Sequence, residues 1–196
     1  PMFHVNAWGV PYAAAMCGAK LVLPGPHLDG ESVYTLMRDE KVTFSQGVPT
    51  VWMMLFQYLD QNPQLDPRQI GVKRIGIGGA AVSRSVLERF ENQFGAEVVQ
   101  GWGMTETSAT AISNAGEDYE RKPASCGVPA PSGEAKIVDD KGAELPRGEV
   151  GELWYKGPIV VRGYWQNEKA TAETFVDGWV KTGDLAKMDD EGFVYI

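Results

Sequence analysis

The pattern of hydrophobic residues changes once along this chain, and that change limits the folds it can adopt. Over residues 1–110, strand-like runs alternate with segments whose apolar residues recur at helical spacing. Such alternation is typical of a mainly parallel sheet with flanking helices. After residue 125, short β segments separated by turn residues indicate a smaller antiparallel, barrel-like subdomain. The predicted fold class is therefore α/β, with an α/β part at 1–115, a β-rich subdomain at 125–196, and a linker at 114–125.

Local signals predict the individual elements. An Asp29 or Ser32 cap, Pro49 in a first turn, a Ser85–Glu88 capping box and an Asn167 cap predict four helices, and the second of them ends at Asn62. A further helix over 8–18 carries a proline in its first turn. The expected strands are 20–23, 42–44, 74–77, 96–100, 134–138, 148–156, 160–161, 179–181 and 193–196.

Composition excludes several classes of function. A formal charge of -8 argues against a nucleic-acid partner, which requires clustered Lys and Arg. Cys17 and Cys126 lack metal-ligand spacing and stand far from both histidines, so we expect no zinc site and infer a reducing, cytoplasmic location. The apolar run 8–19 is too short to cross a bilayer and has no basic segment before it, so it is predicted to be buried structure, not a transmembrane or signal segment.

The stretch 101–107, Gly-Trp-Gly-Met-Thr-Glu-Thr, is interpreted as a nucleotide-binding loop. The Trp102 ring can stack on a purine, the Thr105 hydroxyl can donate to a phosphate oxygen, and Glu106 is a hard ligand for Mg²⁺. The alternative is a tight turn with Trp102 in the core and Thr105 capping a helix. Neither a dinucleotide fingerprint nor a G-x-x-x-x-G-K-[ST] loop occurs. The glycine-rich turns 78–81 and 101–103 are expected at the carboxyl ends of strands, where α/β sheets bind ligands.

Five motifs in order give the chain a resemblance to a known superfamily. They are the residues 1–8, Gly78-Gly79-Ala80, 101–107, the segment from Gly151-Glu152-Leu153 to Gly163-Tyr164, and Lys181-Thr182-Gly183-Asp184. With them the chain resembles the middle of an AMP-forming acyl-CoA synthetase of the adenylate-forming superfamily. The residues 4–8 and 48–52 look most similar to the medium- and long-chain fatty-acid CoA ligases and their methylmercaptopropionate-CoA ligase relatives.

The resemblance implies roles for individual residues. Nucleotide-binding roles are implied for Gly78, Gly79, Ala80, Gln100, Gly101, Trp102, Thr105 and Asp184, of which the first three line the adenine pocket and the last holds the ribose. Catalytic roles are implied for Thr105 at the α-phosphate, for Glu106 as the Mg²⁺ ligand, and for His4 beside the reacting carboxylate. Contacts with the acid are implied for His4, Trp8, Gly103 and Met104. Many relatives carry Tyr in place of Trp102.

The residues themselves leave other readings open. His4 and Trp8 could also be ordinary core residues, and His27 and both cysteines are taken as structural or surface residues.

The implied reaction is ATP-dependent. A fatty or similar aliphatic carboxylate attacks the α-phosphate of ATP, pyrophosphate leaves, and the CoA thiol captures the acyl adenylate, with Mg²⁺ neutralising phosphate charge. The alternatives are an aryl- or short-chain acid CoA ligase, and a non-catalytic binding or scaffold module. The resemblance also allows a homodimer of the full-length protein.

Elements that the superfamily needs for turnover are not found in this sequence. A phosphate loop with its Lys is expected before Pro1, and a hinge Arg and a C-terminal domain with the adenylation Lys are expected after Ile196. We therefore expect a piece of a longer enzyme that is inactive by itself.

Overall fold

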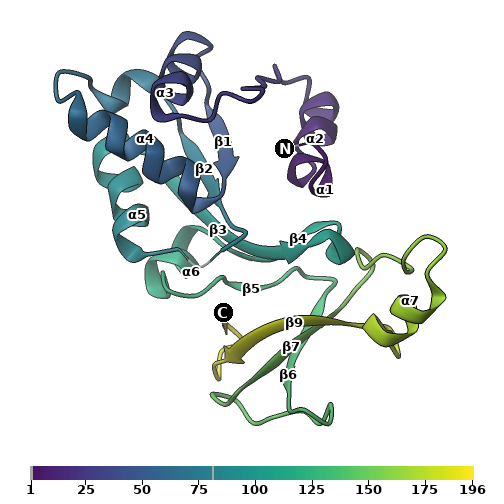
Figure 1. The fold of residues 1–196 in the computed structure, drawn as a ribbon. Helices are drawn as coiled ribbons and strands as arrows, with labels where there is room; N and C mark the ends of the chain where they lie inside the picture. The colour runs from purple at the N-terminus through teal and green to yellow at the C-terminus, as the bar shows by residue number, and fades with distance from the viewer. Residues whose placement is uncertain (1, 81) are drawn as a thin grey trace. The chain divides into compact units, whose positions relative to one another are not determined.

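The computed structural model describes residues 2–80 and 82–196, which form two compact units (Figure 1). The first, here called the α/β unit, is Ala13–Gln100. The second, here called the β-rich unit, contains residues 2–12 together with Gly101–Ile196. The predicted subdomains 1–115 and 125–196 differ from these units in their limits and stay a prediction of how the whole domain is organised.

The α/β unit is built on a parallel sheet, as predicted. Its strands β1 (Phe44–Gly47), β2 (Arg74–Ile77) and β3 (Glu97–Met104), the last of which continues into the β-rich unit, pair in the order β1-β2-β3. Phe44 aligns with Arg74, and Arg74 with Glu97. The helical elements are α2 (Val10–Cys17), which begins in the β-rich unit, α3 (Gly30–Asp39), α4 (Pro49–Gln61), a 3₁₀ turn (Pro67–Ile70), α5 (Arg84–Arg89) and a π turn (Phe90–Phe94).

Local sequence signals explain where the longer helices begin and end. The Asp29 carboxylate accepts a hydrogen bond from the Ser32 amide at 2.9 Å and so caps α3. Pro49 occupies the first turn of α4, where a missing amide donor costs nothing, and Asn62 ends that helix. The apolar stripe of α4 is buried, and Phe56 lies 4.9 Å from Phe90 between ring centres. These predictions are confirmed.

Other local predictions are wrong. Residues 20–23 form no strand, and β1 begins only at Phe44. The capping box at Ser85 does not form, because α5 starts at Arg84 with Ser83 as its N-cap, and Glu88 pairs instead with Arg84 at 2.7 Å. Helix α2 forms where predicted, but none of its residues is buried. The spacing of residues within a segment can predict that a helix forms there. Whether its residues are buried depends on other parts of the chain that pack against it.

The β-rich unit contains antiparallel pairs, as predicted. From Gly101 onward β3 leads through a 3₁₀ turn, η3 (Thr105–Thr107), into β4 (Ala109–Asn114), which pairs with β5 (Val128–Pro129). The second sheet has the order β10-β9-β7-β6, with a short strand β8 beside β9. Its strands are β6 (Glu134–Val138), β7 (Val150–Lys156), β8 (Phe175–Val176), β9 (Trp179–Met188) and β10 (Val194–Tyr195). Two helices, α6 (Gly116–Arg121) and α7 (Glu168–Thr174), complete the unit together with the short turn α1 (Val5–Trp8).

Alternation along the strands builds the core of this unit. Leu153 and Tyr155 of β7 and Val180 of β9 are fully buried, whereas their neighbours in the strands are only partly buried. A Cβ on Gly133 would lie 1.9 Å from the Tyr155 hydroxyl, so the core requires glycine there. Strand β6 matches its prediction, but residues 160–161 form no strand and β9 runs seven residues past its predicted end at 181, to Met188.

The segment 114–125 was predicted as a linker and is instead folded. It contains α6, whose Tyr119 is buried. The buried Asn114 amide donates to the carbonyls of Lys122 and Ser125 at 2.9 and 3.0 Å. A buried amide with backbone partners holds the segment as part of the unit, which polar composition alone does not reveal.

Candidate nucleotide and magnesium site

The sequence predicts a loop over the motif residues 101–107, but only part of this stretch is a turn. Gly101 to Met104 extend β3, and only Thr105–Thr107 turn. A Cβ on Gly103 would lie 1.7 Å from the carbonyl oxygen of Ala109, so this glycine lets the two chain segments approach closely. The glycines therefore serve strand packing as well as turning.

Thr107 fixes the turn that carries the two predicted polar residues. Its side chain is fully buried, and its hydroxyl accepts from the Met104 amide at 3.0 Å. The same hydroxyl lies 2.9 Å from the carbonyl oxygen of Ala109 and 3.1 Å from that of Met104. Thr105 is exposed, and its hydroxyl has no hydrogen-bond partner within the described part of the chain. Sequence reasoning gave Thr107 no role, although a hydroxyl three residues after a strand end is a recognisable turn signal.

Trp102 and Asp184, 82 residues apart, meet in the β-rich unit. The indole ring is 8% exposed and packs in the core beside Tyr155, with ring centres 6.4 Å apart. Its Nε1 donates to Asp184 Oδ2 at 2.7 Å. The core position agrees with one of the two interpretations of the motif, while stacking of this ring on adenine stays a prediction.

The Asp184 carboxylate is held at a fixed place on β9. Its amide donates to the Thr182 hydroxyl at 3.0 Å, and that hydroxyl donates to the Leu153 carbonyl of the adjacent strand at 2.7 Å. One carboxylate oxygen accepts from Trp102, whereas Oδ1 has no hydrogen-bond partner among residues 2–80 and 82–196. A second acceptor oxygen is thus available for a donor such as a sugar hydroxyl.

Glu106 is held by a tyrosine from a distant segment. The Tyr164 hydroxyl donates to Glu106 Oε1 at 2.5 Å, and the pKa of this phenol is raised by that hydrogen bond and, to a smaller extent, by burial. The described residues contain no group of three side chains that could hold a metal ion on their own. Magnesium is often held by one or two carboxylates together with substrate phosphates, so a single carboxylate here fits such an ion.

Four further predicted nucleotide residues lie in the α/β unit. Gly78, Gly79 and Ala80 follow directly after β2, and Gly79 has φ +79°, a conformation that favours glycine. Gln100 is 7% exposed, and its Oε1 is buried with no hydrogen-bond partner among the described residues. A buried acceptor without a donor is costly, which is consistent with a partner that binds there.

The residues predicted to contact the acid are spread over two segments of the β-rich unit. Gly103 and Met104 end β3, and Met104 packs against the core. His4 is exposed and Trp8 half-buried, and between them the backbone forms a left-handed turn with φ from 47° to 53°. Such a turn costs roughly 1–2 kcal/mol per residue for non-glycine residues. No hydrogen bond or ring contact joins His4 to another predicted site residue in the described chain.

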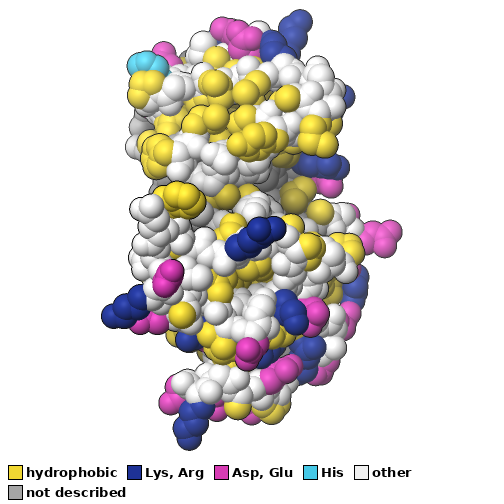
Figure 2. All heavy atoms as spheres, turned by 90° about the vertical axis from the view of Figure 1, so that its right-hand side faces the viewer, with side chains coloured by type: hydrophobic (Ala, Val, Ile, Leu, Met, Phe, Trp, Pro, Cys, Tyr) yellow, Lys and Arg dark blue, Asp and Glu magenta, His cyan; other side chains and the backbone are white. Residues whose placement is uncertain are grey.

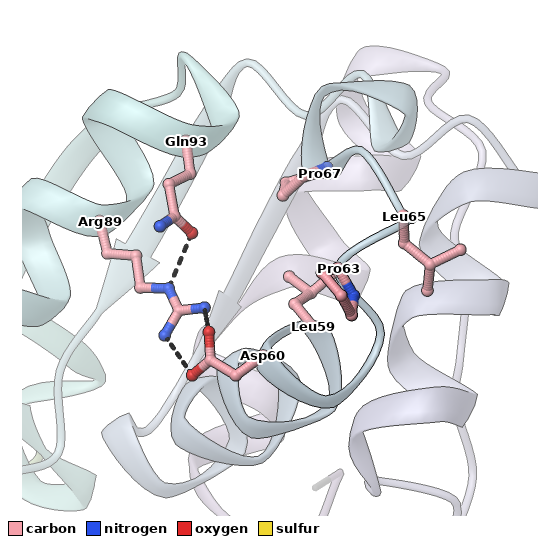
Figure 3. Close-up of a pocket in the computed structure, with 7 residues that line it drawn as sticks. All are labelled: Leu59, Asp60, Pro63, Leu65, Pro67, Arg89 and Gln93. Atoms are coloured by element: carbon pink, nitrogen blue, oxygen red, sulfur yellow. Dashed lines mark hydrogen bonds and ion pairs between the residues drawn. The ribbon is translucent and has the colours of Figure 1, made fainter.

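The α/β unit also has a surface pocket that sequence reasoning missed (Figure 3). Its volume is about 390 Å³, and it is lined by Leu59, Asp60, Pro63, Leu65, Pro67, Arg89 and Gln93. The Arg89 guanidinium already donates to Asp60, to Gln93 and to the Phe56 carbonyl. Because these donors are occupied and none of the predicted site residues lines the pocket, it is not the candidate site.

Large hydrophobic side chains also remain exposed. Figure 2 shows such side chains gathered in the upper part of one face, with few charged ones among them. The most exposed are Phe3, Met16 and Trp165, at 93%, 87% and 89%. None of the described helices is long and apolar enough to cross a membrane.

Sequence comparison then identifies the class of protein. Residues 1–165 match the family of AMP-binding enzymes, and the chain belongs to this family. The residues of the Trp102–Asp184 and Glu106–Tyr164 pairs all lie in the motifs from which the resemblance to this class was inferred. The resemblance to AMP-forming acyl-CoA ligases is therefore confirmed.

Two of the similar curated proteins are fatty-acid–CoA ligases. The chain is 42% identical to a long-chain-fatty-acid–CoA ligase of Thermus thermophilus and 40% identical to a medium-chain-fatty-acid–CoA ligase of Ectopseudomonas oleovorans. In each comparison the whole chain is covered, but only 38% and 37% of the relative. The chain thus spans less than two-fifths of the length of these curated relatives.

Solved structures show the same fold. The N-terminal domain of FACL13 from Mycobacterium tuberculosis is 30% identical with a TM-score of 0.84, and all of this chain aligns with 48% of that one. O-succinylbenzoate coenzyme A synthetase from Bacillus subtilis, in complex with ATP and magnesium ion, is 30% identical with a TM-score of 0.83, and all of this chain aligns with 39% of it. The fold and the class are thus shared by ligases of different acids.

Proposed function

We propose that this chain is the middle part of an ATP-dependent ligase that activates a fatty acid as its acyl adenylate and transfers the acyl group to CoA. The observation that carries the proposal is the meeting of Trp102 and Asp184, because two motifs separated by 82 residues supply one hydrogen-bonded pair. The identities of 42% and 40% with long- and medium-chain fatty-acid ligases support the choice of substrate.

The proposed roles on the nucleotide side follow from the donors and acceptors present. Asp184 has one carboxylate oxygen left for a ribose hydroxyl, and the exposed Thr105 hydroxyl can donate to the α-phosphate. The glycine-rich turn at 78–80 and the orphaned acceptor of Gln100 would serve adenine, which carries an amino donor. Trp102 and Gly101 would define the wall beside that base.

Glu106 is the proposed ligand for Mg²⁺. No Lys or Arg of the described chain lies within ion-pair distance of its carboxylate, so its charge is free to attract a cation. When bound, the ion would neutralise phosphate charge as the acid attacks. The chain's own contribution is to hold this carboxylate in place, while Thr105 holds the α-phosphate.

The acid and the thiol complete the proposal. Gly103 and Met104 would border the reacting carboxylate, His4 would lie beside it, and Trp8 would line the path of the acyl chain. CoA is proposed as the acceptor because the relatives are named as CoA ligases. A cytoplasmic location and a homodimer of the full-length enzyme are proposed with the same class.

An aromatic acid is the second candidate substrate. A specific observation favours it, because a 2-succinylbenzoate–CoA ligase of Bacillus licheniformis is 34% identical over the whole chain. The fold is shared with O-succinylbenzoate and benzoate ligases as well.

The test uses the full-length enzyme that contains this chain. We expect octanoate to support pyrophosphate release and AMP formation faster than benzoate. Reaction with aromatic acids alone would refute the fatty-acid proposal. If neither acid reacts, titration with ATP–Mg²⁺ and an acyl-adenylate mimic would separate a binding module, which binds, from a scaffold, which does not.

The metal assignment has its own matched test. Glu106→Gln should reduce the rate of adenylation by about 10-fold or more, because a metal ligand loses its charge. Glu173→Gln is the control, since Glu173 lies on α7 with its side chain 66% exposed. Equal rates for both variants would contradict the role of Glu106.

A further inference from the structure

Tyr164 contributes to the site from a segment for which the motifs gave no function. It lies 58 residues from Glu106 in sequence, yet its hydroxyl donates to Glu106 Oε1 at 2.5 Å. A distance of 2.5–2.7 Å is typical of a hydroxyl that donates to an ionised carboxylate, where the bond is roughly twice as strong as between neutral groups. The contact thus joins an uncharged donor to the proposed metal ligand.

Both ends of this contact are anchored, so it is more than a meeting of two mobile surface side chains. On one side, the Val161 amide donates to the Glu106 carbonyl at 2.9 Å. Next to it, the Ser108 hydroxyl donates to the Ile159 carbonyl at 2.8 Å. These bonds tie the turn η3 to the segment before Tyr164, and they fix the backbone from which Glu106 projects.

The tyrosine is anchored separately through α7. Its amide donates to the Thr171 hydroxyl at 2.9 Å, and that hydroxyl donates to the Asn167 carbonyl at 2.8 Å. Its ring contacts Phe175 edge-on, with centres 5.6 Å apart. A Cβ on Gly163 would lie 2.5 Å from Thr171, so the glycine allows the loop to pack this closely on the helix.

The charge around Glu106 indicates what the contact does. Within the described chain, the only side chain bonded to the carboxylate is a neutral phenol, and no Lys or Arg pairs with it. The negative charge therefore stays uncompensated. One oxygen is occupied by the hydroxyl, and Oε2 keeps its acceptor capacity for a ligand.

We propose that Tyr164 is a positioning residue for the metal: by holding Oε1, it orients Glu106 so that Oε2 coordinates Mg²⁺ as a single oxygen ligand. The inference rests on the proposed function, because it needs Glu106 to bind the ion. Magnesium demands near-ideal octahedral geometry, so a carboxylate fixed in one orientation binds it better than one that rotates freely. Hydrogen-bonded neighbours of metal ligands commonly act in this way.

The test is metal binding in the full-length enzyme, with Tyr164→Phe as the variant. Phenylalanine keeps the ring beside Phe175 and removes only the hydroxyl. We expect the Kd for Mn²⁺, measured by electron paramagnetic resonance in the presence of a non-hydrolysable ATP analogue, to rise about tenfold, the lower end of the effect of losing such a neighbour. The adenylation rate should fall at limiting Mg²⁺ and recover at saturating Mg²⁺.

A second tyrosine gives a matched control. The Tyr195 hydroxyl donates to the Asp189 carboxylate at 3.2 Å, the same chemistry at a place without predicted site residues. Tyr195→Phe should leave the Kd for Mn²⁺ unchanged. An unchanged Kd in Tyr164→Phe, or a loss of rate that Mg²⁺ does not restore, would overturn the inference.

The outcome also separates this inference from the proposed function. If the inference alone fails, the wild-type enzyme still forms adenylate and Glu106→Gln still binds Mn²⁺ weakly. If the proposed function fails, wild-type enzyme forms no adenylate, and Glu106→Gln binds Mn²⁺ like the wild type.

Discussion

Replacing Thr107 by valine should destabilise the chain by removing one hydroxyl from a fully buried place. Valine has nearly the same shape, so the change leaves no cavity and isolates the hydrogen bonds. The Met104 amide would lose its acceptor at 3.0 Å, and the carbonyl of Ala109 would lose a donor at 2.9 Å. The hydroxyl has one proton, so it can serve only one of its two neighbouring carbonyls at a time.

The magnitude follows from these two losses. An orphaned donor costs about 1–3 kcal/mol, and a lost neutral hydrogen bond about 0.5–1.5 kcal/mol, so the free energy of unfolding should fall by roughly 2–4 kcal/mol. Urea unfolding followed by tryptophan fluorescence measures this. Because the turn carries Glu106, the proposed ligand of Mg²⁺, the affinity of the full-length enzyme for this ion is predicted to weaken too.

Two further variants serve as controls for Thr107→Val. Thr107→Ser keeps the hydroxyl and should retain Mg²⁺ affinity, although losing a buried methyl costs about 1 kcal/mol. Thr110→Val makes the same chemical change at an exposed position and should stay within about 0.5 kcal/mol of the wild type. If Thr107→Val loses no more stability than Thr110→Val, then the hydroxyl does not hold the turn.

Three further predictions concern charge and reactivity. In the full-length enzyme, Asp184→Asn should raise the KM for ATP about tenfold with little change in melting temperature, since the amide keeps an acceptor but loses the charge that strengthens a ribose contact; an unchanged KM would contradict ribose binding. The Lys122 ammonium, 2.6 Å from Glu191, lowers the pKa of that carboxyl below its usual 4.5, with help from a neighbouring arginine. This stabilisation is present above pH 4.5 and is lost as pH falls through the lowered pKa, so urea midpoints of wild type and Lys122→Met should differ at pH 7 and converge in acid; a constant difference would refute the pairing. Burial raises the pKa of the Cys126 thiol to about 12, so at pH 8 a thiol reagent should modify the exposed Cys17 and leave Cys126 intact until the protein unfolds; fast modification of both would be the contrary result.

Sequence-based predictions were mostly correct for contacts between residues a few positions apart in the chain, and less so for contacts between distant segments. The caps at Asp29 and Asn167 and the first-turn position of Pro49 were predicted correctly, because these signals act within three residues of chain. The proposed capping box at Ser85 was wrong because a neighbouring arginine competes for Glu88, and both choices are equally local. The expected strand at 20–23 failed because a strand needs a partner, and apolar composition does not supply one.

The candidate site shows the same division. Its residue types could be found from motif order, since Trp102, Glu106 and Asp184 stand in recognisable patterns. Their partners could not. Tyr164 was inside a motif but carried no signal that its hydroxyl would reach a carboxylate 58 residues away. Figure 3 likewise shows a pocket lined by residues of α4, of the loop after it, of the 3₁₀ turn and of the segment that carries Arg89 and Gln93, and no spacing rule in the sequence connects them.

The sequence by itself determined the α/β order of elements, the antiparallel second part, the glycines that the turns need and the family to which the chain belongs. Hydrophobic period and cap chemistry act over a few residues, so they can be read directly from the chain. Only the tertiary structure decided that Trp102 is a core residue bonded to Asp184, that Glu106 is held by Tyr164, and that Thr107 is buried. Those contacts depend on where strands and turns far apart in sequence come to lie, and register and packing set that only when the whole unit folds.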